Sequence, residues 1–286
     1  MTTTFVRIGG VAHHVVVDGA GPVCVLAAGL GMSWFDWDPV VPLLAPHRTV
    51  VRFDRPGHGL SQPSAAPSTA AAEADRIAAV LDAVLDVPAA RIGRGGPHHA
   101  PVTVVGHSIA GFHAEAFARL HPARTAALVL VDSSVEERPR ASRTAPALAR
   151  ALGAALCAAG VPAALGPAGR ALTVRLSSHR RPDPSPPAEV RRVYRTSRVL
   201  RGTLDENARY GAVAAELLAL RERAPLPPGL PVTVLAAPDG SARWERRQRA
   251  LARRLGARYE AAGPSGHLVM LDRPDAIARA VLDAGR

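Results

Sequence analysis

The fold is decided by the stretch Val102-Thr103-Val104-Val105-Gly106-His107-Ser108-Ile109-Ala110-Gly111. Its apolar start predicts a buried strand, and the small residues that follow predict a sharp turn into a helix. Ser108 lies at the apex of this turn, where the backbone is strained and large side chains two positions away would collide. Gly106 and Ala110 occupy those two positions. A serine held in this way exposes its hydroxyl beside a helix N-terminus, whose N–H groups stabilise anions. The pattern therefore indicates a nucleophilic serine.

Apolar runs and helical periodicities alternate on both sides of this turn. The runs predict strands at 5–8, 14–17, 23–28, 49–54, 126–131, 231–236 and 258–261. The periodicities predict helices at 39–44, 70–85, 109–120, 244–255 and 267–282. Strands that are apolar almost throughout are typical of a mostly parallel sheet with both faces covered. We therefore expect an α/β fold in which helices flank the sheet on both sides.

A long insertion separates the strand at 126–131 from the strand at 231–236. It is far too long for a simple crossover connection. We interpret residues 133–230 as a mainly helical lid, with breaks expected around Pro162–Gly169 and at 181–187. Residues 1–132 and 231–286 would then form one core domain, interrupted by the lid.

The charge balance invites a nucleic-acid interpretation, which the pattern of residues excludes. The net charge is +11, but the chain contains no lysine, and its arginines are interspersed with acids along predicted helices. Such mixing is typical of solvated helix faces, and no nucleic-acid-binding motif accompanies it. The lid carries 16 arginines and 8 acidic residues, so a basic rim could favour anionic substrates.

Cysteine usage and apolar segments bear on localisation. Cys24 and Cys157 are too few for a disulfide framework, so we expect reduced thiols. The N-terminus has no basic region followed by a sustained apolar stretch, so we expect no signal peptide and a cytoplasmic protein. Residues 151–169 are uncharged, but they are rich in alanine and interrupted by prolines. We therefore expect small helices beside an apolar pocket rather than a membrane span.

A serine nucleophile needs a base and an oxyanion hole. The base candidate is His267, which lies in a loop after the last predicted strand, whereas His58 and His107 lie too close to backbone turns. One oxyanion donor is expected to be the N–H of Ile109, directly after the nucleophile. The second should come from the loop after the strand at 23–28, where we choose the Leu30 N–H.

Four blocks of the sequence together resemble the α/β-hydrolase-fold superfamily, in particular its lid-bearing esterases, lipases and C–C hydrolases. The blocks are Ala28-Gly29-Leu30-Gly31, Phe53-Asp54-Arg55-Pro56-Gly57-His58-Gly59-Leu60-Ser61, Gly106-His107-Ser108-Ile109-Ala110-Gly111, and Gly266-His267 followed by Asp272-Arg273-Pro274. Their order and spacing match nearly the whole chain outside the lid. The resemblance implies an eight-stranded sheet, a Ser–His–acid triad and no cofactor or metal.

The acid of the implied triad has two candidates. The family usually carries Gly-x-x-Asp after the strand matched by 231–236, where this chain reads Ala237-Pro238-Asp239-Gly240. Asp239 is our first choice because it is the nearest carboxylate. Asp132, at the end of the strand that follows the Ser108 helix, is the alternative that some members use.

These residues predict a serine hydrolase that cleaves a carboxylic ester or thioester of a small molecule through an acyl-enzyme. Trp34, Phe35 and Trp37 follow the oxyanion loop and are candidates for the wall of the acyl pocket, although such aromatics more often pack in a core. Three alternatives stay open: C–C bond hydrolysis, acyl transfer to another acceptor, and a binding protein on a hydrolase fold.

Overall fold

The computed structural model describes residues 1–92, 100–180, 182–238 and 241–284. An eight-stranded sheet forms its centre, in the spatial order β1-β2-β4-β3-β5-β6-β7-β8. The strands β1 and β2 form an antiparallel hairpin, β2 pairs antiparallel with β4, and all other neighbours are parallel. Their bounds are Thr2–Ile8, Val11–Asp18, Val23–Ala27, Thr49–Phe53, Val102–His107, Thr125–Val131, Val232–Ala236 and Arg258–Ala261, from β1 to β8. The expected mostly parallel sheet is confirmed.

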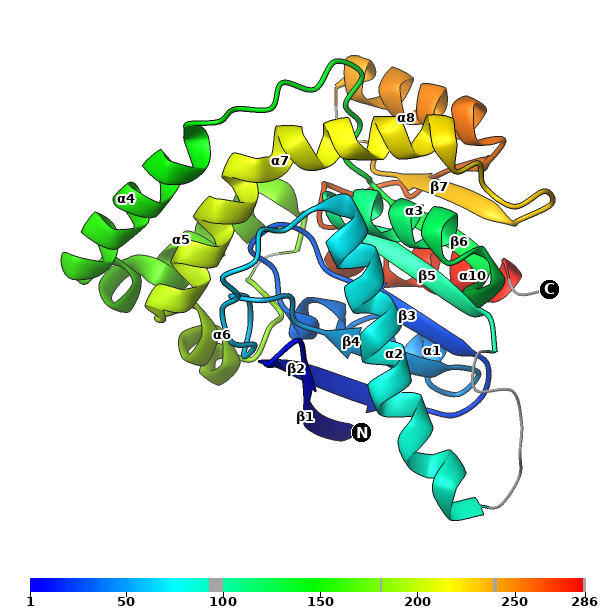
Figure 1. Ribbon diagram of the computed structural model, residues 1–286, viewed down its shortest axis with the longest axis horizontal. Coiled ribbons are helices and arrows are strands. Elements are labelled where there is room, and N and C mark those ends of the chain that lie inside the picture. Colours follow the sequence, from blue (N-terminus) through cyan, green and yellow to red (C-terminus); the bar gives the residue numbers. More distant parts are fainter. Residues whose placement is uncertain (93–99, 181, 239–240, 285–286) are drawn as a thin grey trace.

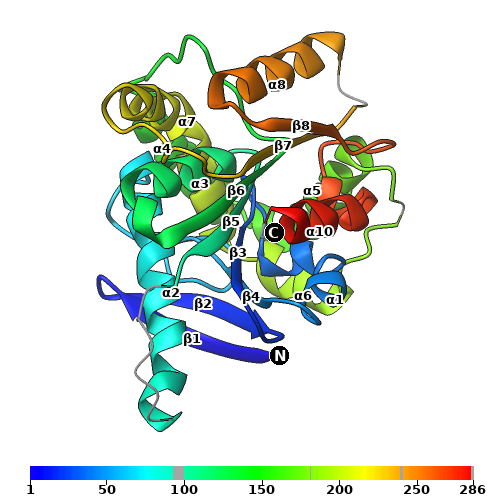
Figure 2. The ribbon, with the colours of Figure 1, turned by 90° about the vertical axis from the view of Figure 1, so that its right-hand side faces the viewer.

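Helices cover both faces of this sheet (Figures 1 and 2). One face packs against α2 (Ala70–Ile92), α3 (Ala110–Leu120), the later part of α7 (Ser197–Arg223) and α8 (Ala242–Leu255). The opposite face packs against α1 (Val41–Leu44), α9 (Val269–Asp272) and α10 (Pro274–Asp283). Side chains alternate between these two apolar clusters along the central strands: Val104 faces the first and Val105 the second. This alternation explains why the central strands are apolar throughout.

Four helices fall within residues 133–230 and form the lid. They are α4 (Ala145–Ala158), α5 (Val161–Ser177), α6 (Pro187–Tyr194) and α7. The expected break at 181–187 is confirmed over its described residues 182–186, which precede α6. The break around Pro162–Gly169 is wrong, because α4 ends at Ala158 and α5 starts at Val161 and continues through Pro167. A proline at this position leaves the Ala163 carbonyl without its helical donor. The Arg195 Nε–H donates to that carbonyl at 2.9 Å, which makes the proline tolerable.

One further prediction needs correction, and one element was not predicted. The helix expected at 267–282 is divided into α9 and α10 at Arg273, because Pro274 starts a new helix and cannot continue the old one. Trp34–Trp37 forms a short 3-10 helix that the sequence did not suggest.

Cys24 and Cys157 are free cysteines. Within the described residues, no single helix is long and apolar enough to cross a bilayer, although α4 and α5 pass that test together, bent by 108°.

Candidate active site

Ser108 lies at the junction between β5 and α3, as the sequence predicts. Its φ of 56° is left-handed, a conformation that costs a non-glycine residue free energy and is therefore kept where function needs it. The turn is tight: a Cβ on Gly106 would lie 2.3 Å from the Ala110 carbonyl oxygen. Only glycine fits there. The Ser108 carbonyl accepts the N–H groups of Gly111 and Ser134, which fixes the backbone of the turn.

His267 connects Ser108 to a carboxylate. Its Nε2 lies 3.1 Å from the Ser108 Oγ, and its Nδ1 lies 2.6 Å from Oδ2 of Asp132. The side chain of His267 is 39% exposed, so it can be reached from solvent, whereas Asp132 is buried. The three residues come from loops after β5, β6 and β8, which the parallel sheet brings to the same edge. The three side chains form one hydrogen-bonded series from Ser108 through His267 to Asp132.

Asp132 is held rigidly by its surroundings. Its Oδ1 accepts the Ala237 N–H at 3.0 Å and the Trp244 Nε1–H at 2.8 Å, so only Oδ2 is left for the imidazole. Its φ of 39° is also left-handed, so both Ser108 and Asp132 sit in strained conformations. Asp239, our first choice for the acid, lies outside the described residues.

His107 fixes the loop that carries the base, a role that the sequence did not reveal. Its Nε2–H donates to the His267 backbone carbonyl at 2.9 Å, and the two rings lie 4.7 Å apart. Burial, with His267 nearby, holds the pKa of His107 well below its ordinary value, so the ring is neutral. A Cβ on Gly29 would lie 2.6 Å from Nδ1 of His107, so this glycine is required by the ring that packs on it.

The two expected oxyanion donors flank the elbow. Ile109 directly precedes α3, and Leu30 follows β3 at the neighbouring strand end. Neither backbone N–H donates to another group in the part of the chain that the structure describes. Arg55 fixes the backbone of the loop that carries Leu30, because its guanidinium donates to the carbonyls of Ala28 and Gly29, the latter at 2.9 Å. The Gly29 carbonyl and the Leu30 N–H belong to one planar peptide and point in opposite directions, so Arg55 sets the direction of that N–H.

Arg55 is fixed in turn by the lid. Glu206 of α7 accepts its Nε–H at 2.7 Å and its Nη2–H at 2.9 Å. Burial would raise the pKa of Glu206, but Arg55 and His58 outweigh burial and hold that pKa well below its ordinary value. The lid is thus tied to the oxyanion loop by a buried ion pair.

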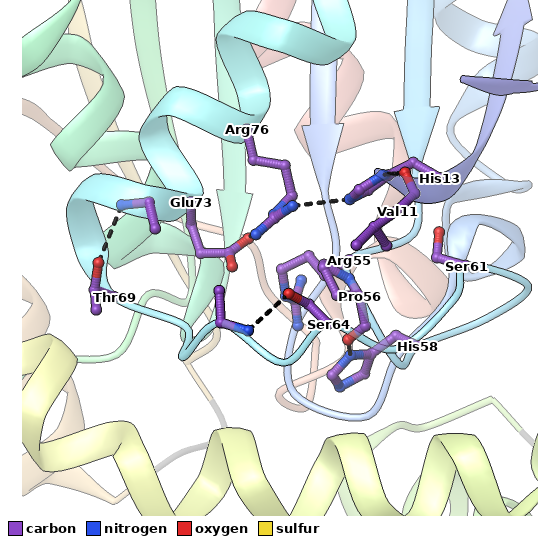
Figure 3. A network of polar contacts seen from close by, with 12 residues as sticks. Val11, His13, Arg55, Pro56, His58, Ser61, Ser64, Thr69, Glu73 and Arg76 are labelled. Atoms are coloured by element: carbon purple, nitrogen blue, oxygen red, sulfur yellow. Dashed lines mark hydrogen bonds and ion pairs between the residues drawn. The ribbon is translucent and has the colours of Figure 1, made fainter. Parts of the chain in front are cut away.

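A wider polar network surrounds this pair. Figure 3 shows Arg55 and His58 in the loop after β4, with Glu73 and Arg76 of α2 facing them. Arg76 pairs with Glu73 at 3.1 Å and contacts His13 at 2.9 Å. A cavity of about 560 Å³ adjoins the network, between the loop 56–68, α2, α4 and α7.

Two of the three aromatic candidates, Phe35 and Trp37, are buried in apolar clusters, which corrects their assignment to a pocket wall, whereas Trp34 is partly buried. Trp37 is fully buried in the cluster beneath α1 and α10. Phe35 is buried against Val193 and Val199 of the lid, with Trp34 beside it. Large aromatic side chains gain more free energy from burial than from exposure to substrate, and Phe35 is buried where the lid meets the core, whereas Trp37 lies within the core.

A cavity of about 370 Å³ opens beside the imidazole. Its described lining is made by Asp132, Leu176, Ser177, Ala237, Ser241, Trp244, Gly266 and His267. Asp272 connects the lid to the loop of His267, because it accepts the Gly266 N–H at 2.9 Å and the Ser178 hydroxyl at 2.6 Å. The lid therefore borders the reacting groups on this side as well. No group of three or more His, Cys, Asp and Glu side chains among the described residues is arranged to hold a metal ion.

Comparisons with known proteins agree with this geometry. A model of the alpha/beta hydrolase family matches residues 24–280. An uncharacterized protein of Mycobacterium tuberculosis is 32% identical over 132 residues, which are 46% of this chain and 35% of that protein. The match thus spans about a third of the length of the curated relatives.

Solved structures resemble the whole chain. Cfl2 from Burkholderia cenocepacia superposes with a TM-score of 0.72 at 23% identity, covering 99% of this chain and 95% of that one. The enol-lactonase from Burkholderia xenovorans LB400 gives 0.66 at 22% identity, with 98% and 99% covered. A thermophilic esterase from Thermogutta terrifontis gives 0.65 at 21% identity, with 99% and 97% covered. At these identities the likeness concerns the fold.

Proposed function

This chain belongs to the alpha/beta hydrolase family, and we propose that it is a serine hydrolase that cleaves carboxylic esters or thioesters of small molecules through an acyl-enzyme. The observation that carries the proposal is the hydrogen-bonded line from Ser108 through His267 to Asp132, with distances of 3.1 and 2.6 Å. A serine hydroxyl is a weak nucleophile until a base at hydrogen-bond distance removes its proton. An acid on the far side of the base fixes the tautomer that can do so.

In the first half of the proposed reaction, the Ser108 Oγ attacks the substrate carbonyl carbon while Nε2 of His267 takes the hydroxyl proton. The carbonyl oxygen becomes an oxyanion, held by the N–H groups of Leu30 and Ile109. Asp132 stabilises the imidazolium that forms. The tetrahedral intermediate then expels the alcohol or thiol, which takes the proton from His267 and leaves Ser108 acylated.

In the second half, water replaces the leaving group. His267 removes a proton from the water as its oxygen attacks the acyl carbon, and the same two N–H groups hold the new oxyanion. Collapse of this intermediate releases the carboxylic acid and returns the proton to the Ser108 Oγ. The exposure of His267 towards the 370 Å³ cavity supports this step, because the water must reach the imidazole.

Hydrolysis of a panel of p-nitrophenyl esters, thioesters and a lactone tests the proposal; the lactone is included because one structural neighbour is an enol-lactonase. The expected result is turnover of at least one class, lost in Ser108→Ala. Turnover that survives unchanged in Ser108→Ala would contradict the assignment of the nucleophile. A folded wild type that turns over no ester, thioester or lactone would contradict the activity.

A further inference from the structure

Two helices of the lid leave large apolar side chains in water. The residues are leucines of α4 and α5, exposed as follows: Leu148 67%, Leu152 51%, Leu165 59%, Leu172 55% and Leu176 75%. Burying such side chains is the main favourable term in folding, so a group of them left exposed marks a surface that something else covers. We call these five residues the lid leucines.

The lid leucines form one stripe on each helix. Leu148 and Leu152 are four residues apart on α4, and Leu172 lies seven residues after Leu165 and four before Leu176 on α5. At 3.6 residues a turn, each set shares one face of its helix. The opposite face of α4 packs on α7, where Gly153 is buried against Arg201. In Figure 1, α4 lies at the outer edge of the lid, far from the sheet.

The same segment is strongly basic. Between Glu137 and Asp183 the chain carries eight arginines and no acidic residue. One of them, Arg170, is buried and paired with Asp36 at 2.5 Å and Asp183 at 2.8 Å. Four others are exposed around the two helices, namely Arg140, Arg143, Arg175 and Arg180, whereas Arg150 faces α7 and pairs with Asp205 at 3.5 Å. The exposed charges of the segment that carries the lid leucines are therefore all positive.

We propose that this surface of α4 and α5 binds anionic lipid bilayers. A second copy of the chain would bring one positive surface against another, which like-charge repulsion disfavours. Helices with leucines on one face and arginines around them lie in the interface of a bilayer, where the apolar face enters the acyl region and the cations meet anionic headgroups. Leu176 also lines the cavity that contains His267, so a bound bilayer lies next to that cavity. The inference stands whether or not the protein hydrolyses esters.

Co-sedimentation with vesicles tests this proposal. Wild type is mixed with vesicles of phosphatidylcholine alone, or of phosphatidylcholine and phosphatidylglycerol in equal parts, at low and at high salt. We expect binding to the anionic vesicles, at least about tenfold weaker binding to neutral ones, and loss of binding at high salt, where the charges are screened. The paired variants Leu148→Ser/Leu152→Ser and Leu165→Ser/Leu172→Ser should each bind at least about tenfold more weakly, because every leucine that enters the bilayer contributes to partitioning.

Leu43→Ser and Leu120→Ser are the matched controls. Both leucines are exposed, at 42% and 36%, but lie outside the lid, so binding should stay within about twofold of wild type. Circular dichroism of each variant checks that it is folded. Absence of binding to anionic vesicles at low salt would overturn the proposal, and so would equal binding by wild type and the lid variants. Self-association that the lid substitutions abolish, without vesicle binding, would show that a second copy covers this surface instead.

Discussion

Replacing Asp132 with asparagine separates the charge of the triad acid from its shape. An asparagine side chain offers one oxygen and one NH2 group in place of two equivalent oxygens. The N–H groups of Ala237 and Trp244 both donate to the Oδ1 position, so the asparagine oxygen belongs there. The NH2 group then faces Nδ1 of His267 and can only donate to it. The imidazole is thereby fixed with its proton on Nε2, where it cannot accept the proton of Ser108.

The size of the effect follows from this geometry. A wrong tautomer in a Ser–His–Asp triad lowers kcat by about 10⁴-fold, which is about 5 kcal/mol of transition-state stabilisation. The asparagine cannot escape by rotating its amide, because the NH2 group would then face the two N–H donors. Leaving two buried donors without an acceptor costs roughly 2 to 6 kcal/mol. The unproductive arrangement is therefore the stable one, and the loss should approach the full 10⁴-fold.

Initial rates with a p-nitrophenyl ester that wild type cleaves give kcat and KM, and the thermal midpoint of each variant checks the fold. Asp132→Asn should lose kcat with little change in KM. Asp239→Asn, the acid that the sequence favoured first, should stay within about twofold of wild type, because no charge of the triad is lost. A folded Asp132→Asn that keeps more than a tenth of the wild-type kcat would refute the tautomer argument. A large loss in Asp239→Asn alone would assign the acid to that residue.

Three further predictions concern the elbow, the oxyanion loop and a buried histidine. Ser108→Gly should be more stable than Ser108→Ala by about 1 kcal/mol in urea unfolding, because glycine adopts a φ of 56° without strain; equal stabilities would argue against strain at this residue. Arg55→Lys keeps a positive charge beside Glu206 but cannot hold the carbonyls of both Ala28 and Gly29. Because loss of an oxyanion donor lowers kcat by 10²- to 10³-fold, a misplaced donor should lower kcat by about 10- to 100-fold at similar KM. An unchanged kcat would contradict the positioning role of Arg55. Burial lowers the pKa of His113 to about 4, whereas the histidine of the unfolded chain has a pKa of about 6.5. As the pH falls from about 6.5 to about 4, the unfolded chain is protonated while the folded chain is not, so the folded state loses stability over that range. From pH 7 to pH 5 the free energy of unfolding of wild type should therefore fall by about 2 kcal/mol more than that of His113→Leu, and parallel losses in the two proteins would contradict the assignment.

The elements that position the nucleophile could be predicted because their signals are local. The run 102–105 had to be a buried strand, and Gly106 and Ala110 left room for the turn at Ser108. His267 followed from its place after the last strand. The division between α9 and α10 was missed although Pro274 marks it, because the periodicity of the apolar residues continues across the break.

The remaining features depend on contacts between distant segments. The donors that hold Asp132 are the Ala237 N–H and the Trp244 indole, more than 100 residues away, so no local pattern could single out this carboxylate. The helix through Pro167 depends on Arg195 of the next lid segment. Trp37 was a candidate for the acyl pocket because of its position in the sequence, and only the packing of α1 and α10 puts it in the core.

Covalent labelling with a fluorophosphonate reports on the triad directly, because this reagent reacts with a serine only when its base and oxyanion hole are assembled. The labelled protein is digested, and mass spectrometry identifies the modified residue. We expect a single adduct on Ser108 in wild type and no adduct in Ser108→Ala. An intact, folded wild type that takes up no label, or a label that persists in Ser108→Ala, would contradict the assignment of Ser108 as the activated nucleophile.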